Sequence, residues 1–432
     1  MIRSASSSGL HVPRHRSTTA HLSVLYPWHN DRGLGERGVY VGSNESGGGG
    51  AWCYDPFQLY TDGVLTSPNI VVLGQVGSGK STAVKTLLYR SIGQLHSGNA
   101  TPRWCAIIDP KGEYGPLADA LGLTTLKLYP GGTTRLNPLD AGPSGGNGDE
   151  MRARRTSLVV ALASVALRRE LTATEEAALG WVLDAVAARP GSTPTLHDVV
   201  DVLATPTDEI ASRAGETPAV LARQLAELRH GIARLIDGHL RGMFDSTSTE
   251  EVSWSDRGVV IDLSAVHHDR DALTTVMVAA TGWLQALLAD PAGDAPRRTQ
   301  VLEEIWALLG NEHTAKYVQS CQKLARSYGV ANVLVAHRVA DFRAQTDDGT
   351  ATAKIGTGLL AETQTRILFR QPSDQVVEAA ELLGLTETEQ RILPRLARGR
   401  AIWHVGDHRA VVQHHISRAE LAICDTNTRL VI

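Results

Sequence analysis

Cysteine is scarce in this chain of 432 residues, and the four that are present lie far apart. They are Cys53, Cys105, Cys321 and Cys424, and no two of them form a C-x-x-C pair. This spacing argues against a zinc site and against a disulfide-stapled scaffold, and it fits a reducing compartment. We therefore expect the function to rest on other side chains.

Long apolar runs and a large net charge are also missing. Apolar stretches such as 158–167 are shorter than the roughly 18 residues that a membrane-spanning helix needs. We expect no integral membrane segment and a cytoplasmic protein, which partners could hold at the inner face of the cell membrane. The formal net charge is −4, so any contact with nucleic acid needs a local basic patch.

The order of sequence patterns predicts an α/β fold with one helical insertion. Residues 1–50 are rich in serine, glycine and basic residues, and we expect a disordered lead there. From Tyr54 onward, short β-branched runs alternate with helical patterns, which is typical of a mostly parallel sheet between helices. The expected strands are 69–73, 104–109, 125–128, 258–263, 300–304, 332–336, 366–370 and 401–405.

The middle of the chain shows only helical spacing, at 152–169, 174–189, 196–203 and 219–236. We therefore expect an all-helical insertion over 141–245. It would divide a single α/β domain into 51–140 and 246–432.

Residues 74–82, with the sequence GQVGSGKST, follow the first expected strand and match the complete P-loop pattern. Glycines 74, 77 and 79 would let backbone N–H groups surround phosphate oxygens. We expect Lys80 to reach the β- and γ-phosphates and the Ser81 hydroxyl to ligate Mg²⁺. A ligand-free glycine turn explains the glycines but not the Lys-Ser pair. The expected cofactors are ATP and Mg²⁺, and the expected binding residues are Gly74, Gly77, Ser78, Gly79, Lys80, Ser81 and Thr82.

Glu303 and Glu304 end a later expected strand. Because parallel sheets bind ligands at the carboxyl ends of their strands, both carboxylates would face the phosphates. We expect Glu303 to serve the magnesium shell and Glu304 to activate the attacking water. The alternative is a strand that ends in two solvated acids. Aspartate is the usual residue on the metal side, and Glu303 is longer by one methylene.

His337 ends the expected strand 332–336 and is a candidate sensor of the γ-phosphate. The alternative is a polar strand cap without a catalytic task.

Six motifs occur in an order that resembles the ATPase core of conjugative type IV secretion ATPases, within the HerA/FtsK group of RecA-like motors. They are the P-loop, DPKGEY (109–114), LNPL (136–139), GMFD (242–245), EEIWALL (303–309) and AHR (336–338). The similarity covers about residues 54–415. It implies a RecA-like ATPase that forms a homo-hexamer, binds proteins of the secretion or conjugation apparatus, and moves DNA, protein or both. The family more often has glutamine at the position of His337, and it generally carries a docking domain ahead of the motor.

The resemblance also implies an arginine finger that reaches the nucleotide of a neighbouring subunit. Arg326, in the segment LARSYG, matches the family's arginine-containing segment, and Arg366 and Arg370 flank the next strand. A late basic cluster could line a pore for DNA phosphates, or it could be a solvated face or a subunit contact. Its members are Arg391, Arg395, Arg398, Arg400 and Arg409.

Two other functions fit the sequence. One is an FtsK- or HerA-like double-stranded DNA translocase. The other is a regulatory switch that hydrolyses ATP slowly and recruits partners. Turnover stimulated by DNA favours a pump, whereas slow turnover with ATP-dependent partner binding favours a switch.

Overall fold

The structure of the chain is a computed structural model. It describes residues 33–46, 48–94, 102–142, 148–189, 193–250, 252, 256–288, 296–325, 327–342 and 351–426. Most of the expected disordered lead, residues 1–32, lies outside these ranges.

The described residues form one sheet of eleven strands in the order β2-β1-β11-β10-β9-β3-β8-β7-β4-β6-β5. Neighbouring strands from β9 to β5 are parallel, whereas β10, β11, β1 and β2 pair antiparallel at one edge. The expected α/β fold with a mostly parallel sheet is confirmed. The strands are β1 (Val39–Asn44), β2 (Gly50–Tyr54), β3 (Ile70–Leu73), β4 (Arg103–Asp109), β5 (Thr124–Lys127), β6 (Gly258–Asp262), β7 (Arg297–Leu302), β8 (Val330–Ala336), β9 (Thr365–Leu368), β10 (Arg400–Val405) and β11 (His408–His414).

Successive residues of the buried strands point to opposite sides of the sheet, so both of its faces are apolar. Helices cover both faces. In β3, Ile70 and Val72 belong to one apolar cluster, and Val71 and Leu73 belong to the other. The Ile70 side carries α2 (Pro56–Thr61), α3 (Lys80–Gln94), α4 (Gly115–Leu121) and α17 (Arg418–Cys424). The Val71 side carries α11 (Arg270–Leu288), α12 (Trp306–Leu309), α13 (Glu312–Ala325), α14 (Ala351–Glu362), α15 (Val376–Leu383) and α16 (Glu387–Ile392). Short 3₁₀ turns occur at Ser264–Val266, Val339–Phe342, Ser373–Gln375 and Leu393–Arg395.

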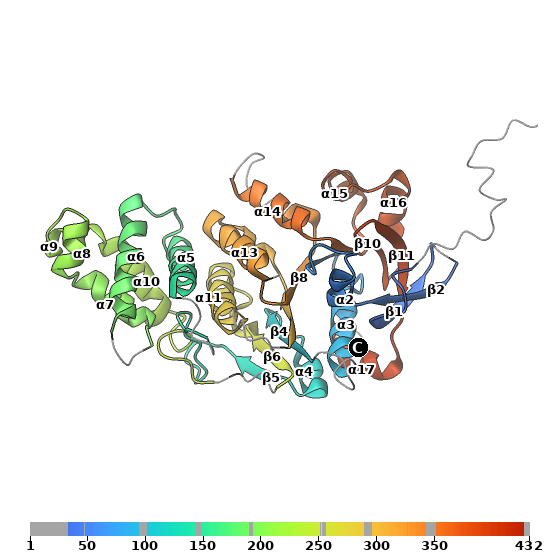
Figure 1. Ribbon diagram of the computed structural model, residues 1–432, viewed down its shortest axis with the longest axis horizontal. Coiled ribbons are helices and arrows are strands. Elements are labelled where there is room, and N and C mark those ends of the chain that lie inside the picture. Colours follow the sequence, from blue (N-terminus) through green and yellow to red (C-terminus); the bar gives the residue numbers. More distant parts are fainter. Residues whose placement is uncertain are drawn as a thin grey trace, which may run out of the picture.

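The described residues between β5 and β6 contain six helices and no strand. Figure 1 shows most of them at the end of the elongated molecule opposite β1 and β2. Reciprocal bonds between Thr172 and Glu175 cap the start of α6, and α5 packs on α11 of the core. The helix expected over 219–236 is divided at Leu225. These helices are α5 (Gly148–Leu167), α6 (Ala173–Ala187), α7 (Leu196–Ala204), α8 (Asp208–Arg213), α9 (Pro218–Gln224) and α10 (Ala226–Asp237).

Ordered structure begins earlier than expected. The sequence placed residues up to 50 in a disordered lead, but β1 occupies Val39–Asn44 and pairs with β2 and β11. Glycine is needed within β1, because a Cβ on Gly42 would lie 1.9 Å from the carbonyl oxygen of Gln413. The glycines that suggested disorder therefore include one that permits close strand pairing.

Helix α11 is long and apolar enough to cross a membrane. However, 94% of its apolar window is buried inside the protein, and it contacts α5, α12 and β4. These contacts are those of a core helix.

Candidate active site

The P-loop connects β3 to α3 and forms a tight turn. β3 ends at Leu73 and α3 begins at Lys80. Gly77 and Gly79 have φ angles of 80° and 102°, which side chains with a Cβ rarely adopt. The Lys80 side chain is buried beside this turn, and Ser81 follows it in the first turn of the helix. The expected strand, loop and helix are therefore in place, and the positive end of the helix dipole faces the loop.

Neighbouring segments hold the P-loop in position. The Ser78 hydroxyl donates to the Gln75 carbonyl oxygen at 2.7 Å, and the Gly399 N–H donates to the Ser78 carbonyl oxygen at 3.0 Å. The Gln75 N–H donates to the Arg370 carbonyl oxygen at 3.1 Å. When the Gln75 amide oxygen faces Arg370, it accepts from Nε at 2.7 Å and from Nη2 at 2.8 Å.

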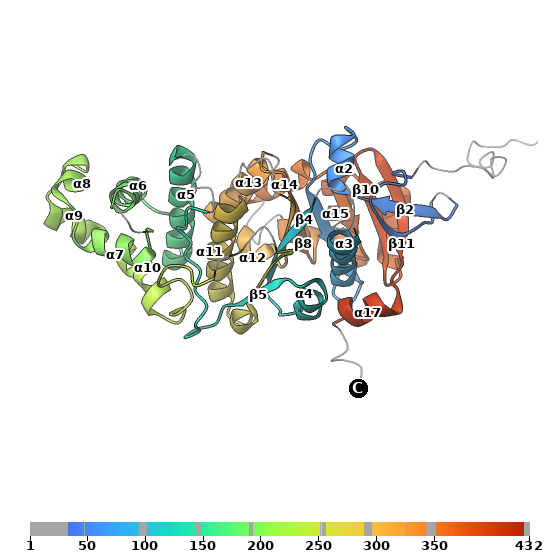
Figure 2. The ribbon, with the colours of Figure 1, turned by 60° about the horizontal axis from the view of Figure 1, so that its bottom comes forward.

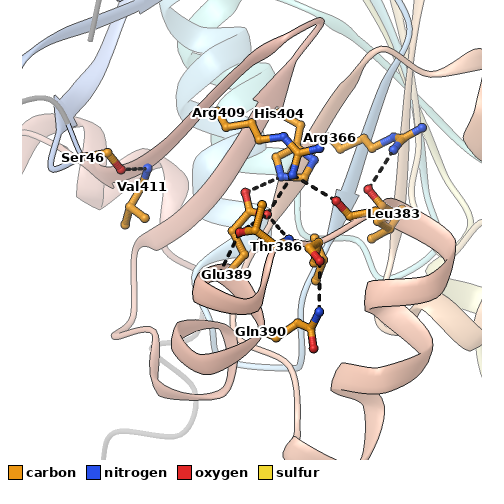
Figure 3. Close-up of polar contacts among 11 residues, drawn as sticks. Ser46, Arg366, Leu383, Thr386, Glu389, Gln390, His404, Arg409 and Val411 are labelled. Carbon is orange, nitrogen blue, oxygen red and sulfur yellow. Dashed lines mark hydrogen bonds and ion pairs between the residues drawn. The ribbon is translucent and has the colours of Figure 1, made fainter. Parts of the chain in front are cut away.

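The contacts of Arg370 and Arg366 within the chain argue against either residue as the expected arginine finger. Arg370 binds the P-loop of its own chain. Arg366 donates to the carbonyl oxygens of Leu360, Thr363 and Leu383 at 3.1 to 3.3 Å, and Figure 3 shows the contact with Leu383. Arg326 lies outside the described residues, so its expected role stays a prediction.

Strand register brings the two glutamates to the edge of the sheet that carries the P-loop. Leu302 of β7 pairs with Leu334 of β8, and Ala336 of β8 pairs with Leu73 of β3. The strand expected through residue 304 ends at Leu302, so both glutamates lie just beyond it. Two strand spacings, about 10 Å, separate β7 from β3. That separation leaves room for phosphates and a hydrated ion.

Glu304 lies in an unusual backbone conformation and makes several polar contacts. Its φ of 54° is one of two positive values among the non-glycine residues that the structure describes. Oε1 lies 3.0 Å from Nε2 of His337 and forms an ion pair with Nζ of Lys111, while Oε2 accepts from the indole of Trp306. Burial opposes ionisation, but His337 and Lys111 hold the pKa of Glu304 far below its usual range. The carboxylate is thus ionised at neutral pH.

Glu303 has a different environment. Its side chain is buried, and Oε1 accepts a hydrogen bond from the Tyr114 hydroxyl at 2.6 Å. Tyr114 follows Asp109, whose carboxylate accepts from the backbone N–H groups of Lys111 at 3.2 Å and of Tyr114 at 2.8 Å. Burial raises the pKa of Asp109 to about 6.

Sequence reasoning identified the DPKGEY motif but gave its residues no role in the site. The signal was present, because Lys111 and Tyr114 follow a buried strand, as the glutamates and His337 do. The position of β4 beside β7 was needed to show that these two side chains contact the glutamates.

Ser81 and Glu303 provide oxygen donors of the kind that Mg²⁺ prefers. In protein sites this ion keeps several waters and binds one or two carboxylates together with substrate phosphates. The described residues contain no group of three or more histidine, cysteine or acidic side chains that could hold a metal alone. A hydroxyl and one carboxylate beside a P-loop therefore fit magnesium that arrives with a nucleotide.

Comparison with protein families shows to which family the chain belongs. The sequence model described as "Helicase HerA, central domain" matches residues 56–278, which is more than half of the chain. The chain belongs to this family. No curated protein sequence matches this HerA-family chain.

Solved structures show the same fold in conjugation proteins. VirB4 of Thermoanaerobacter pseudethanolicus is 20% identical, with a TM-score of 0.71 over 90% of this chain and 100% of that chain. Unbound TrwB, a bacterial conjugative coupling protein lacking its first 70 residues, is 16% identical, with a TM-score of 0.55 over 81% of this chain and 85% of that chain. TrwB in complex with ADP and Mg²⁺ is 15% identical, with a TM-score of 0.54 over 81% and 86%. The resemblance to conjugative ATPases of the HerA/FtsK group is confirmed, and the fold is RecA-like.

A cavity of about 320 Å³ adjoins the P-loop of this HerA-family chain. Thr82 and Thr86 line it from α3, and Leu421 and Asp425 line it from the region of α17. Gly79 and Gly399 place one end of the cavity next to the phosphate loop. The cavity is therefore suited to the part of a nucleotide that lies beyond its phosphates.

The late arginines do not form one patch. Arg391, Arg395 and Arg400 line a groove of about 560 Å³ together with Glu45, which pairs with Arg400 at 2.7 Å. Arg398 instead lines the cavity next to the P-loop and pairs with Asp425.

Arg409 belongs to a third group, which fastens α16 to the β10–β11 hairpin (Figure 3). It donates to Oε2 of Glu389 at 3.0 Å, and Nε2 of His404 lies 2.8 Å from Oε1 of the same carboxylate. These contacts give Arg409 and His404 a structural role. The basic cluster expected from the sequence is thus reduced to the three arginines of the groove.

Proposed function

We propose that this HerA-family chain is an ATP-hydrolysing motor of a conjugative-transfer or type IV secretion-like system. It couples ATP hydrolysis to the translocation of DNA, protein or both. Family membership and the fold shared with VirB4 and TrwB support the proposal. The observation that carries it is the P-loop at the end of β3, with an ionised glutamate at the end of β7 on the same edge of the sheet.

Each residue of the site has a task in this reaction. Lys80 binds the β- and γ-phosphates, and the backbone of Gly77 and Gly79 surrounds their oxygens. Ser81 and Glu303 would hold Mg²⁺, which neutralises phosphate charge when it is bound. Glu304 is the carboxylate that polarises the attacking water.

The ribose and base extend into the cavity beside α3, because the P-loop glycine Gly79 lines one end of it. The mixed lining, with Thr86 on one side and Leu421 on the other, can contact both the sugar hydroxyls and an apolar ring. ADP and Mg²⁺ in the structure of TrwB support the choice of cofactors.

The same proposal includes an assembly and a location. The motor acts as a homo-hexamer in which a neighbouring subunit supplies an arginine, and Arg326 is the candidate. It works in the cytoplasm and reaches the inner face of the cell membrane through proteins of the transfer apparatus.

Two substitutions test the core of the proposal. Lys80→Ala should abolish ATP binding, because the phosphates lose their cation. Glu304→Gln should keep ATP binding and lower turnover by at least about a hundredfold, because the amide is not a base. Binding is measured with a fluorescent ATP analogue, and hydrolysis by phosphate release. Hydrolysis by Glu304→Gln at the wild-type rate would contradict the assignment of the base.

The wild-type protein distinguishes the alternatives. Turnover stimulated by double-stranded DNA, with movement along it and without transfer proteins, would favour a DNA translocase. Slow turnover that no nucleic acid or apparatus protein stimulates would favour a regulatory switch.

A further inference from the structure

One loop contacts both catalytic glutamates. Residues 110–114 follow β4, and Tyr114 donates to Oε1 of Glu303 at 2.6 Å, while Lys111 forms an ion pair with Glu304. The two contacts differ in kind, because one donor is a neutral hydroxyl and the other is a cation. The loop can therefore set the orientation of Glu303 through an uncharged donor.

We propose that Tyr114 is a positioning residue for Glu303, whose carboxylate it holds in the orientation that the magnesium shell needs. This inference rests on the proposed function. It adds a role for a residue outside the P-loop and the acidic strand end.

The surroundings of Glu303 leave this hydrogen bond to fix the orientation of its carboxylate. Tyr114 supplies the one hydrogen bond that reaches the Glu303 carboxylate within the described part of the chain. Glu303 is 7% exposed, so solvent has little access to the side chain. The phenol holds Oε1, and the other carboxylate oxygen would serve the magnesium shell. A glutamate here is one methylene longer than the usual aspartate, and fixing its additional torsion reduces the entropy lost on binding.

Tyr114 is itself rigid enough to act in this way. Its ring is 1% exposed, and its N–H is held by the Asp109 carboxylate at 2.8 Å. Nζ of Lys85 lies 4.9 Å from the centroid of the Tyr114 ring and 3.7 Å from Oε2 of Glu113. Because Lys85 belongs to α3, these contacts connect the helix of the P-loop to the residue that holds Glu303.

The test is Tyr114→Phe, which removes one oxygen and keeps the ring. We expect the affinity for Mn²⁺, measured by electron paramagnetic resonance in the presence of ADP, to fall about tenfold, the scale of a hydrogen bond to a charged group. The affinity for a fluorescent ATP analogue in EDTA should stay unchanged. Tyr54→Phe is the matched control, because Tyr54 is equally buried and donates to Thr365 at 2.9 Å, outside the site.

A double-mutant cycle separates positioning from general packing. In a Glu303→Gln background, Tyr114→Phe should cause no further loss of Mn²⁺ affinity, because its effect passes through Glu303. A full additional loss would overturn the proposal, as would equal Mn²⁺ affinities of Tyr114→Phe and Tyr54→Phe. If the wild-type protein with ADP bound no Mn²⁺, the magnesium site of the proposed function would fail as well. The two failures are therefore distinguishable.

Discussion

Nε2 of His337 lies 3.0 Å from Oε1 of Glu304, and the two residues follow neighbouring strands, β8 and β7. β8 is also the direct neighbour of β3, which leads into the P-loop. His337 is therefore located between the candidate base and the phosphate loop. This position agrees with the hypothesis that it senses the γ-phosphate, and it explains how a signal could reach Glu304.

We expect His337→Gln to retain most of the turnover, because an amide can donate to Glu304 as the imidazole does. His337→Ala should lower kcat about tenfold and leave ATP binding intact, since a hydrogen bond to a charged group is lost. Steady-state hydrolysis and analogue binding check both variants. Wild-type turnover in His337→Ala would show that the residue is only a strand cap.

The sequence predicted the features that depend on local patterns. The buried run before the P-loop and the glycine spacing within it identify β3, the turn and α3 without information from elsewhere in the chain. Strands β1, β2 and β11 were missed. β1 contains Gly42, which is typical of a loop, and it pairs with β11, which is distant in sequence. β11 pairs with β10 in a local hairpin, so its signal was present and was overlooked. Contacts between residues that are distant in sequence were missed in the site as well. Tyr114 reaches Glu303 only because β4 packs beside β7.

Arg370 should act in its own subunit, because it binds Gln75 of its own P-loop. We expect Arg370→Ala to weaken ATP binding, and a mixture with Lys80→Ala subunits should regain no activity, since each subunit lacks a functional P-loop. Arg326→Ala mixed with Lys80→Ala should regain activity if Arg326 is the finger that acts in trans. Hydrolysis measured across mixing ratios distinguishes the two residues. Recovery with Arg370→Ala would contradict the role in cis.

Arg90 of α3 and Glu420 of α17 form a buried, bidentate ion pair at 2.6 and 2.8 Å. Figure 2 shows α17 next to α3. The hydrogen bonds from Arg90 lower the pKa of Glu420 from 4.5 to about 2. Because the carboxylate is favoured in the folded state, its stabilisation is complete above pH 4.5 and is lost as the pH falls toward 2.

Glu420→Gln should therefore lower the free energy of unfolding by about 2 kcal/mol at pH 7. The difference from wild type should shrink between pH 4.5 and pH 2. Urea unfolding at several pH values measures both effects. Glu209→Gln is the control, because its pair with Arg213 is exposed and contributes little. A difference that is constant with pH would refute the link to Glu420.

The cavity beside α3 gives a prediction about the nucleoside. Leu421 lines this cavity and is 42% exposed, so a larger side chain can be accommodated without disturbing the core. We expect Leu421→Trp to reduce affinity for ATP about tenfold by filling space that the base needs, while inhibition of hydrolysis by pyrophosphate is unchanged. Competition assays with both ligands check this. Equal losses for ATP and pyrophosphate would place the base elsewhere.

The groove lined by Arg391, Arg395 and Arg400 gives the prediction about DNA. Arg391 and Arg395 are exposed, so both can reach phosphates. The nearby Trp403 is fully buried and donates to His414 at 2.9 Å, so it cannot stack on a base. Contact with DNA at this groove would therefore involve the backbone, and DNA should stimulate hydrolysis less as salt rises.

Replacing both Arg391 and Arg395 with glutamine should weaken binding to all DNA sequences about equally. The slope of log affinity against log salt should become shallower by about 2, because each phosphate contact with duplex DNA contributes about 0.9. Basal hydrolysis should not change. Arg213 and Arg223, which belong to α8 and α9 at the other end of the molecule (Figure 1), provide a control with the same loss of charge. An unchanged slope would show that the groove does not bind DNA, and no DNA binding by the wild-type protein at low salt would favour a motor that exports protein.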